Sequence, residues 1–334
     1  MTTYRAVQVS PDGNLEPTER PLIEPSPEQV RIRVEACGIC HSDSAAVHPH
    51  SAGTANRVPG HEAVGRIDAL GERVTGWAIG DRVGVGFLGG QCGVCAECRR
   101  GNFVTCVDQP WTGVTVDGGY AEVMYARQSG VVAVPDTLSA LEAAPLLCAG
   151  FTTFNALNKG AALPGDLVAI QGIGGLGHLG IQYARAMGLR VAAIARGTDK
   201  AAIAAKLGAH HYLDSTAADV GAELQKLGGA RVIVATASRG AMSPLIAGLA
   251  PGGKLVTVGV SDEPVEVSTL DLIFRGVEIL GSLTGTSAQN EENLRFADAQ
   301  DVAALTELAP LADAASAYAR MLSGAARFRM VLTI

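Results

Sequence analysis

Residues 167–188 read LVAIQGIGGLGHLGIQYARAMG, which is a short apolar strand, a glycine-rich turn and then a helical run. Gly172, Gly174 and Gly177 follow the pattern GxGxxG, in which glycines permit a tight turn and let bare backbone approach a pyrophosphate at the N-terminus of a helix. The pattern alone is weakly diagnostic, because a plain glycine loop also satisfies it. Its place between a strand and a helix favours a Rossmann dinucleotide site.

Strands and helices continue to alternate after this turn. Five more short apolar segments have the composition of strands, and the helical stretches between the first five strands end near glycines suited to C-caps. The further expected strands are 191–195, 211–213, 232–236, 255–260 and 277–283, and the expected helices are 152–160, 181–188, 199–208, 218–228 and 243–250. This alternation predicts an α/β domain with a doubly wound parallel sheet over residues 151–283.

The segment before residue 151 has a different pattern. Its apolar runs are short and β-branched, and turn sequences separate them. The expected strands are 30–34, 63–70, 82–86 and 131–134. We therefore expect residues 1–150 to form a β-rich, barrel-like domain. Residues 284–334 contain one good helix, 313–324, and the strand 329–334, and this tail is expected to return to the first domain.

Size and charge exclude several classes of protein. The chain has 334 residues, 48% hydrophobic and 18% charged, which is enough for two globular domains with buried cores. Its formal net charge of -7 lacks the basic footprint that a nucleic-acid or membrane-surface partner requires, so neither partner is expected. The N-terminus lacks a signal-peptide pattern, and no apolar run approaches the roughly 18 residues of a spanning helix. With thiols grouped at metal spacing, the cytoplasm is the expected location.

Four of the seven cysteines lie within the stretch CGVCAECRRGNFVTC, residues 92–106. Cys92, Cys95, Cys98 and Cys106 can close tetrahedrally around one Zn²⁺ with no open position, as in structural zinc sites. So short a lobe has too little apolar surface to fold alone, so the metal would have to supply its order. The alternative is two disulfides, which is disfavoured because nothing else in the sequence looks secreted.

Two other cysteines and one histidine suggest a second, open metal site. Cys40 lies in CGICHSD, His61 follows in GHE, and Cys148 lies shortly before the α/β domain. Two thiolates and one imidazole leave a fourth position for water or substrate, which a catalytic zinc needs. Spacing alone does not establish the site, since a lone Cys148 is more often a small buried hydrophobe.

The second strand of the α/β domain ends at Ala195 and Arg196. At about this distance from the glycine loop, NAD sites usually carry an Asp or Glu that binds the adenosine ribose. Ala195 removes the repulsion that such a carboxylate exerts on a 2′-phosphate, and Arg196 offers a guanidinium group. NADP is therefore the favoured cofactor. NAD is the alternative if Arg196 is only a solvated loop charge.

Longer motifs extend over nearly the whole chain. They are GICHSD, PGHEAVG, GDRVGVG, DGGYAEV, LLCAGFTTFNAL, GIGGLGHLG and the closing RFRMVLTI, beside the four-cysteine lobe. In these motifs the chain resembles the zinc-dependent alcohol dehydrogenases of the medium-chain dehydrogenase/reductase superfamily. The resemblance implies a GroES-like catalytic domain and a Rossmann domain, a catalytic zinc on Cys40, His61 and Cys148, and a structural zinc on the lobe. Cys37 is then predicted to be a small core residue.

The resemblance also implies roles for residues around the open zinc. Asp43 would orient His61, and Glu62 would lie close behind the metal. The Ser42 hydroxyl would start a proton relay from the alcohol. Besides the three glycines and Arg196, the implied cofactor-binding residues are His41, Thr152, Gly175, Leu176, Ala195, Val258, Val260 and Arg329.

Two parts of the family's active site are left open by the motifs. Ala45 stands where horse and yeast type enzymes have the histidine that ends the proton relay. His48 or His50 could replace that histidine, although each is more typical of a solvated loop, and cofactor ribose and water could also complete the relay. Phe87 and Trp111 match positions that line the family's substrate pocket, or are ordinary core aromatics.

The implied activity is reversible hydride transfer between a primary or secondary alcohol and NAD(P), with zinc lowering the pKa of the bound alcohol. A cinnamyl-alcohol-type aldehyde reductase that uses NADPH is the alternative within the family. From another class, a zinc- and nucleotide-binding protein without turnover is disfavoured by Ser42 and by the open ligand set. The resemblance also implies a homodimer or homotetramer joined near residues 277–283.

Overall fold

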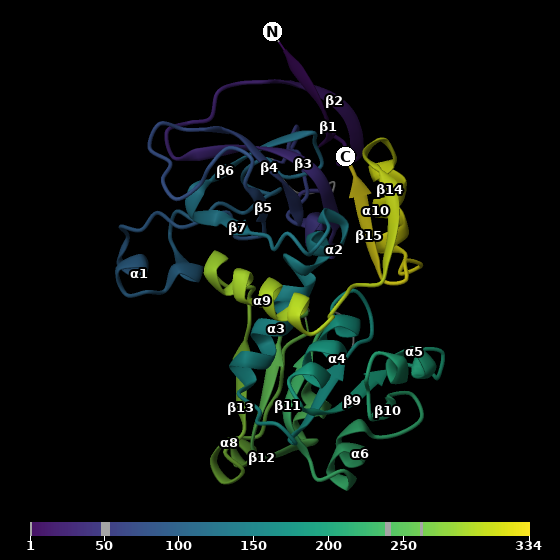
Figure 1. The fold of residues 1–334 in the computed structure, drawn as a ribbon. Helices are drawn as coiled ribbons and strands as arrows, with labels where there is room; N and C mark the ends of the chain where they lie inside the picture. The colour runs from purple at the N-terminus through teal and green to yellow at the C-terminus, as the bar shows by residue number, and fades with distance from the viewer. Residues whose placement is uncertain (1, 48–53, 238–241, 261–262) are drawn as a thin grey trace. The chain divides into compact units, whose positions relative to one another are not determined.

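The computed structural model describes residues 2–47, 54–237, 242–260 and 263–334. The chain divides into two compact units, and Figure 1 labels most of their helices and strands. Unit 1 consists of Met1–Phe151 together with Thr284–Ile334, and unit 2 consists of Thr152–Leu283. In the sequence, unit 2 is therefore one continuous segment that separates the two parts of unit 1.

A parallel sheet forms the centre of unit 2. Among the described residues it has six strands in the order β10-β9-β8-β11-β12-β13. The strands are β8 (Leu167–Gln171), β9 (Arg190–Ala195), β10 (His211–Asp214), β11 (Ala230–Ala235), β12 (Leu249–Thr257) and β13 (Glu278–Gly281). Strands β9 and β11 flank β8, so the strand order reverses beside β8. This is the doubly wound arrangement that the sequence predicts.

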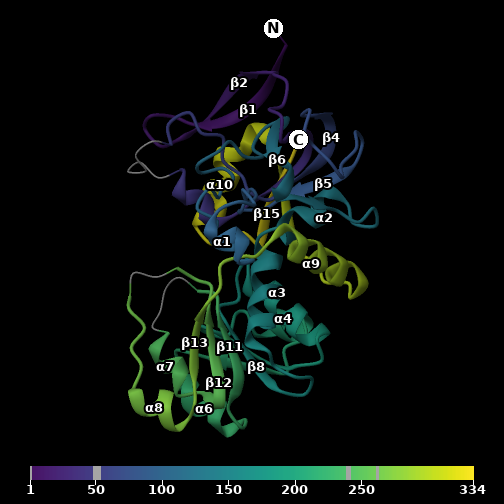
Figure 2. The same ribbon diagram turned by 90° about the vertical axis from the view of Figure 1, so that its left-hand side faces the viewer.

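The helices of unit 2 connect these strands. They are α4 (Gly177–Ala186), α5 (Ala201–Lys206), α6 (Val220–Lys226), α7 (Ser243–Ile246) and α8 (Thr269–Phe274), while α3 (Ala149–Gly160) begins in unit 1 and continues into unit 2. Figure 2 shows α4 and α7 on opposite sides of the sheet. Because helices cover both faces, residues 168–170 of the central strand and 191–194 beside it are buried whichever way they point.

Two connections in unit 2 differ from the prediction. The helix expected at 243–250 is only the four-residue α7, because Leu249 already pairs with Ala230 of β11 and so begins β12. The apolar pattern does not predict α8. The side chain of Ser268 accepts a hydrogen bond from the N–H of Leu270 and caps the start of that helix.

Unit 1 is built on strands of mixed direction. Its described residues contain the pair β1-β2 and a seven-stranded sheet in the order β14-β15-β3-β4-β5-β7, with β6 also paired to β3. The strands are β1 (Thr3–Val9), β2 (Leu15–Pro21), β3 (Gln29–Ile39), β4 (Ala63–Leu70), β5 (Arg82–Val85), β6 (Val123–Arg127), β7 (Val131–Ala133), β14 (Thr306–Pro310) and β15 (Arg329–Thr333). The four strands expected before residue 151 correspond to β3, β4, β5 and β7.

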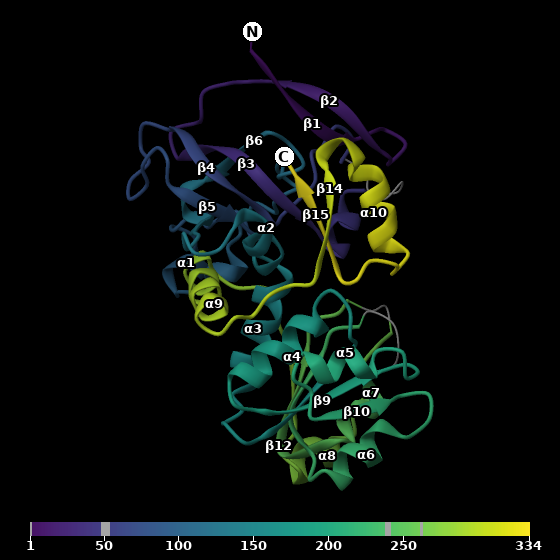
Figure 3. The ribbon, with the colours of Figure 1, turned by 45° about the vertical axis from the view of Figure 1, so that its right-hand side comes forward.

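Short helices and 3-10 turns connect these strands. They are η1 (His41–Ala45), α1 (Ala96–Arg99), η2 (Phe103–Thr105), η3 (Gln128–Gly130), α2 (Ala140–Ala143), η4 (Ala144–Leu146), α9 (Ser287–Ala299), η5 (Leu311–Asp313) and α10 (Ala314–Leu322). Helix α10 matches the helix expected at 313–324, but the expectation of a single helix in the tail is wrong, because α9 precedes it. Strand β15 pairs parallel with β14 and antiparallel with β3. Figure 3 shows β14 and β15 beside α10.

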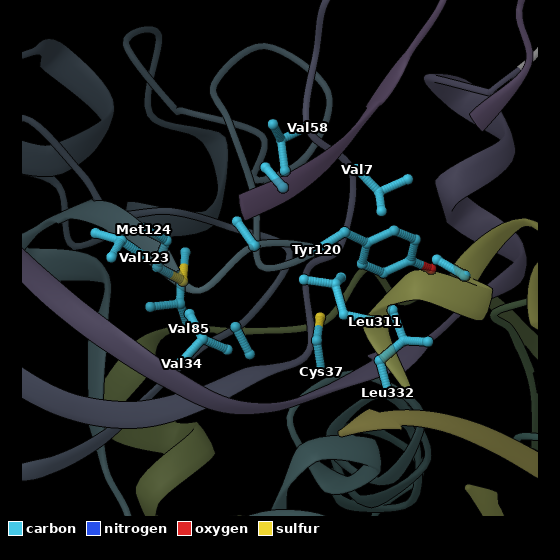
Figure 4. Close-up of a cluster of buried hydrophobic side chains, with 14 of the residues drawn as sticks. Val7, Val34, Cys37, Val58, Val85, Tyr120, Val123, Met124, Leu311 and Leu332 are labelled. Carbon is cyan, nitrogen blue, oxygen red and sulfur yellow. The ribbon is translucent and has the colours of Figure 1, made fainter. Parts of the chain in front are cut away.

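The core of unit 1 gathers buried side chains from both ends of the chain. Val7, Tyr120, Leu311 and Leu332 belong to one hydrophobic cluster, drawn in Figure 4. Cys37 lies in the same cluster with no exposed surface, which confirms its prediction as a small core residue.

No single helix in the described part of the chain is long and apolar enough to cross a membrane. The pair Ala140–Leu146 and Ala149–Gly160 meets the length and composition criterion only when the two are taken together across a bend. Most apolar side chains of this pair are buried within the protein.

Candidate functional site

Three side chains from separate segments of unit 1 converge on one buried point. Cys40 follows β3, His61 precedes β4, and Cys148 lies between η4 and α3. Together with Glu62 they form a buried group whose ligand atoms all lie within 4.8 Å of one another. The sulfur atoms of the two cysteines are 3.9 Å apart. The structure thus brings together the three residues that are predicted to hold the open zinc.

The turn that leads to His61 depends on glycine. Gly60 has a φ of +99°, a conformation that residues with side chains rarely adopt. An added Cβ there would lie 2.4 Å from the Tyr120 ring and 2.8 Å from the sulfur of Cys37. The chain can pass this close to the core only because residue 60 has no side chain, and the next residue then reaches the two cysteines.

Asp43 fixes the orientation of the His61 ring. Its Oδ1 lies 2.9 Å from Nδ1 of His61. Its Oδ2 accepts hydrogen bonds from the Cys40 N–H at 2.9 Å and from the Tyr120 hydroxyl at 2.8 Å. A carboxylate that engages one imidazole nitrogen leaves the other as a metal ligand. Tyr120 is a partner of Asp43 that sequence reasoning missed, although it lies within the motif DGGYAEV.

The donor set has the chemistry of a zinc site. Nε2 of His61 is buried and has no hydrogen-bond partner among the described residues, which points to a ligand beside it. The contact between the two thiols, with the nearby His61 ring, holds the pKa of Cys40 well below its usual range, whereas the same contact and burial raise the pKa of Cys148. Without a metal the two cysteines therefore share one negative charge. Two sulfurs bound at about 2.3 Å to one tetrahedral ion lie roughly 3.8 Å apart, close to the separation found here.

Glu62 and Arg329 form a buried ion pair next to the three ligands. Nη2 of Arg329 donates to both carboxylate oxygens of Glu62 at 2.5 Å. Burial raises the pKa of Glu62 to about 7, against the opposing effect of Arg329. Glu62 thus lies close to the metal ligands, as expected. Arg329, which is expected near the cofactor pyrophosphate, is engaged by Glu62 inside unit 1.

The four-cysteine lobe forms a second cluster around α1. The ligand atoms of Cys92, Cys95, Cys98 and Cys106 lie within 4.8 Å of one another. Sulfur–sulfur distances of 3.6 and 4.0 Å exceed the roughly 2.05 Å of a disulfide and match a shared metal. Backbone N–H groups, first that of Cys98, lower the pKa of Cys95 to about 6. The lobe therefore fits the predicted closed zinc site better than the disulfide alternative.

Two aromatic rings extend from the metal ligands. The Phe87 ring meets the His61 ring edge to face, with centroids 5.1 Å apart. The Trp111 ring stacks on Phe87 at 6.1 Å and is 47% exposed. Phe87 is half-buried and Trp111 exposed, so neither ring is fully buried in a core.

The turn η1 carries other residues predicted for the site. His41, Ser42 and Ala45 are exposed on it, directly after Cys40. The Ser42 hydroxyl can therefore exchange protons with solvent. His48 and His50, the alternative ends of the relay, lie outside the described residues.

In unit 2 the glycine loop joins β8 to α4. An added Cβ on Gly177 would lie 1.7 Å from the carbonyl oxygen of Gly172, so the helix can start this close to the strand only with glycine. At Gly174 an added Cβ would meet no protein atom within 4 Å. A pyrophosphate fits such a loop, because it needs bare backbone N–H groups with free space beside them.

Cationic side chains lie at the same edge of the parallel sheet. Ala195 ends β9, and the exposed Arg196 follows it. Nζ of Lys200 donates to the carbonyl of Ile173 in the glycine loop at 2.7 Å, and sequence reasoning missed this residue. Since the carboxyl ends of parallel strands share one edge, the glycine loop and these side chains can act on one ligand.

The remaining predicted cofactor residues lie in the same unit. Gly175 and Leu176 complete the glycine loop, and Leu176 immediately precedes α4. Val258 and Val260 follow β12 at its carboxyl end, and Val260 is 84% exposed. Thr152 is buried in α3. Ten of the twelve predicted cofactor residues therefore belong to unit 2, and the other two, His41 and Arg329, belong to unit 1.

Two family models match the sequence, one within unit 1 and one over most of unit 2 and helix α9. The alcohol dehydrogenase GroES-like domain matches residues 26–136, and the zinc-binding dehydrogenase domain matches residues 175–299.

Curated and structural relatives cover almost the whole chain. An alcohol dehydrogenase patD of Penicillium expansum is 42% identical over 100% of this chain and 98% of its own length. An alcohol dehydrogenase of Geobacillus stearothermophilus is 40% identical over 95% of this chain and 94% of its own. A cinnamyl alcohol dehydrogenase of Sorghum bicolor superposes with a TM-score of 0.87 at 32% identity, covering 99% of this chain and 98% of that one.

Proposed function

We propose, since this chain belongs to the family of zinc-binding alcohol dehydrogenases, that Cys40, His61 and Cys148 hold the zinc at which an alcohol reacts. The protein is an oxidoreductase that interconverts alcohols with aldehydes or ketones, using zinc and a nicotinamide cofactor. The observation that carries the proposal is the buried Nε2 of His61, which has no partner among the described residues and shares its position with two thiols.

Different residues of the chain would have different roles around the zinc held by Cys40, His61 and Cys148. When bound, the zinc would lower the pKa of the alcohol and the nicotinamide would accept its hydride. Asp43 and Tyr120 hold His61 with one nitrogen free to ligate. We assign the first proton transfer to Ser42, which is exposed on η1 and can pass the proton to solvent. Ala45 offers no acidic or basic group to this relay. Phe87 and Trp111 would shield the substrate, which favours aliphatic or aromatic alcohols; a cinnamyl-type aldehyde reductase fits the same surface.

Metal analysis combined with a cofactor absorbance assay tests the site. The purified chain should contain two zinc ions, one for each cluster, and should reduce the nicotinamide only when an alcohol is added. One zinc per chain without alcohol-dependent turnover would overturn the assignment of Cys40, His61 and Cys148.

We further propose that the cofactor is NADP. Ala195 removes the carboxylate that would repel a 2′-phosphate, and Arg196 is exposed directly after it. Lys200 adds a second positive charge near the glycine loop. The nearest carboxylate, that of Asp214 on β10, already accepts hydrogen bonds from the N–H groups of Gly197 and Thr216. Arg196 and Lys200 therefore remain as the cations that favour the more negative cofactor.

Replacing Arg196 by Ala should lower the ratio of kcat/KM for NADP over NAD by about 10- to 100-fold, because a charge-assisted hydrogen bond to phosphate is lost. Steady-state kinetics with both cofactors measures this ratio. Arg190→Ala is the matched control, since Arg190 is an exposed arginine at the opposite end of the same strand. An unchanged NADP preference in the Arg196 variant would refute the assignment.

We also propose that the chain forms a homo-oligomer through the last strand of the parallel sheet. Strand β13 is an edge strand, and edges with free N–H and C=O groups pair readily with another chain. The neighbouring α8 exposes 72% of Ile273 and 80% of Phe274, and Leu283 after β13 is 49% exposed. A second copy, bringing the same edge and the same apolar residues, would cover them.

Phe274→Glu should reduce the assembly state, because it places a charge in the apolar part of this contact. Light scattering at fixed protein concentration should show a dimer or tetramer for the wild type and a smaller mass for the variant. Ile79→Glu is the control, since Ile79 is an exposed apolar residue of unit 1. A monomeric wild type, or an equal loss of mass in both variants, would contradict this interface.

A further inference from the structure

Helix α9 places two buried amide side chains against the segment that carries Cys148. Asn290 is 2% exposed and Asn293 is fully buried. Nδ2 of Asn290 donates to the carbonyl of Leu147 at 3.0 Å, and Nδ2 of Asn293 donates to the carbonyl of Leu146 at 3.1 Å. Nδ2 of Asn293 also donates to Oδ1 of Asn290 at 3.1 Å, so the two amides act as one unit.

The contacted carbonyls belong to the two residues directly before Cys148. Between η4 and α3 the helical run is interrupted at residues 147–148. Breaks of this kind leave carbonyl groups short of backbone donors, and side chains often supply them. The amides of α9 donate at this break, and they therefore fix the backbone from which the Cys148 thiol projects.

The support behind the amides is itself anchored. The Ser287 hydroxyl donates to the Ser129 carbonyl at 3.0 Å, and the Ala133 N–H donates to Glu291 at 3.1 Å. On the other side, an added Cβ on Gly86 would lie 3.1 Å from the Leu147 oxygen and 3.4 Å from the Asn290 amide nitrogen. A side chain at residue 86 would therefore press on the carbonyl–amide contact, which glycine leaves undisturbed.

We infer that Asn290 and Asn293 are positioning residues for the metal: they hold the Cys148 segment so that its thiol meets Cys40 and His61 without rearrangement. The inference rests on the proposed role of Cys148 as a zinc ligand. Residues that orient a ligand without touching the metal typically change metal affinity by about 10- to 100-fold when replaced. If the two side chains supported only the fold, their replacement would lower stability without changing metal affinity at the open site selectively.

The test follows zinc release from the full-length holoprotein to a chromophoric chelator, with the four-cysteine lobe as the internal reference. Asn290→Asp and Asn293→Asp keep the side-chain shape but remove the donor. Each should speed release of the open-site zinc by about 10- to 100-fold and leave release from the lobe unchanged. In the cobalt-substituted protein, the same variants should shift the thiolate-to-metal charge-transfer band of the open site.

Leu294→Ala is the matched control, because Leu294 is fully buried on the same helix and carries no polar group. It should lower the melting temperature without changing zinc release. Equal acceleration in this control, or unchanged release in both Asp variants, would overturn the inference. If the Asp variants do not fold, Asn290→Ser and Asn293→Ser repeat the comparison.

A separate variant distinguishes failure of the proposed function from failure of the inference. Cys148→Ser should remove part of the cobalt charge-transfer band. If that band and the zinc content are unchanged, Cys148 is not a ligand and the proposed site is wrong. If they change while the Asn variants behave as wild type, only the positioning role is wrong.

Discussion

His61→Gln should lower kcat/KM for alcohol by about a thousandfold or more and should cost one zinc per chain. Loss of this ligand removes the Lewis acid, whose charge stabilisation is worth several kcal/mol, and each 1.36 kcal/mol corresponds to about a tenfold change in rate. Dinucleotide binding, followed by fluorescence titration, should be retained, because the glycine loop belongs to unit 2. The variant therefore separates loss of chemistry from loss of cofactor.

Cys98→Ser is the matched variant in the closed cluster. It should also cost one zinc per chain, but it should lower the melting temperature or the assembly state while kcat of the folded protein stays within a few-fold of wild type. Each variant would then lose one zinc per chain, but the His61 variant would lose turnover and the Cys98 variant would lose stability or assembly. A stable but slow Cys98 variant, or a His61 variant with near-normal turnover, would show that the roles of the two clusters are assigned wrongly.

Gly174→Ala should weaken dinucleotide binding by on the order of a hundredfold, about 2.7 kcal/mol, without changing the melting temperature. The added methyl group meets no protein atom within 4 Å and would occupy the space that the proposal gives to the pyrophosphate. Gly177→Ala places its methyl 1.7 Å from the Gly172 carbonyl oxygen, so it should lower both binding and stability. Isothermal titration and thermal unfolding measure the two effects on each variant.

The contrast between these glycines makes the result easy to interpret. If Gly174→Ala bound the dinucleotide as wild type does, this loop would not hold the pyrophosphate. If Gly177→Ala left stability intact, the close approach of helix to strand at Gly172 would be mistaken.

Local patterns in the sequence predicted much of the fold. Two motifs consist of residues close together in the sequence: the four cysteines of residues 92–106 and the glycines of the loop after β8. Their spacing alone therefore predicts that the residues of each motif lie together. The strands of the parallel sheet were found because buried strands are continuous apolar runs. The segment 243–250 was predicted to be one helix because its apolar residues suit a helix as well as a strand. In the structure α7 ends early, because Leu249 pairs with β11.

Contacts between distant residues could not be predicted in this way. Arg329 reaches Glu62 across 267 positions, and Tyr120 reaches Asp43 across 77. Helix α9 escaped prediction because its buried face includes Asn290 and Asn293, and so lacks a continuous apolar stripe. The signal that was available is the Thr286–Gln289 capping box at its start.

The position of β15 between β14 and β3 in the unit 1 sheet sets the order in which the two units can form during synthesis. Unit 2 is complete once residue 283 has been made, and it can fold while the rest is still being translated. Strand β3 is made before unit 2, whereas its neighbour β15 is made after unit 2. Arg329 is made with that strand, so Glu62 gains its cationic partner only after unit 2 has been made. A chain that stops before β15 therefore has a complete unit 2 but lacks part of unit 1.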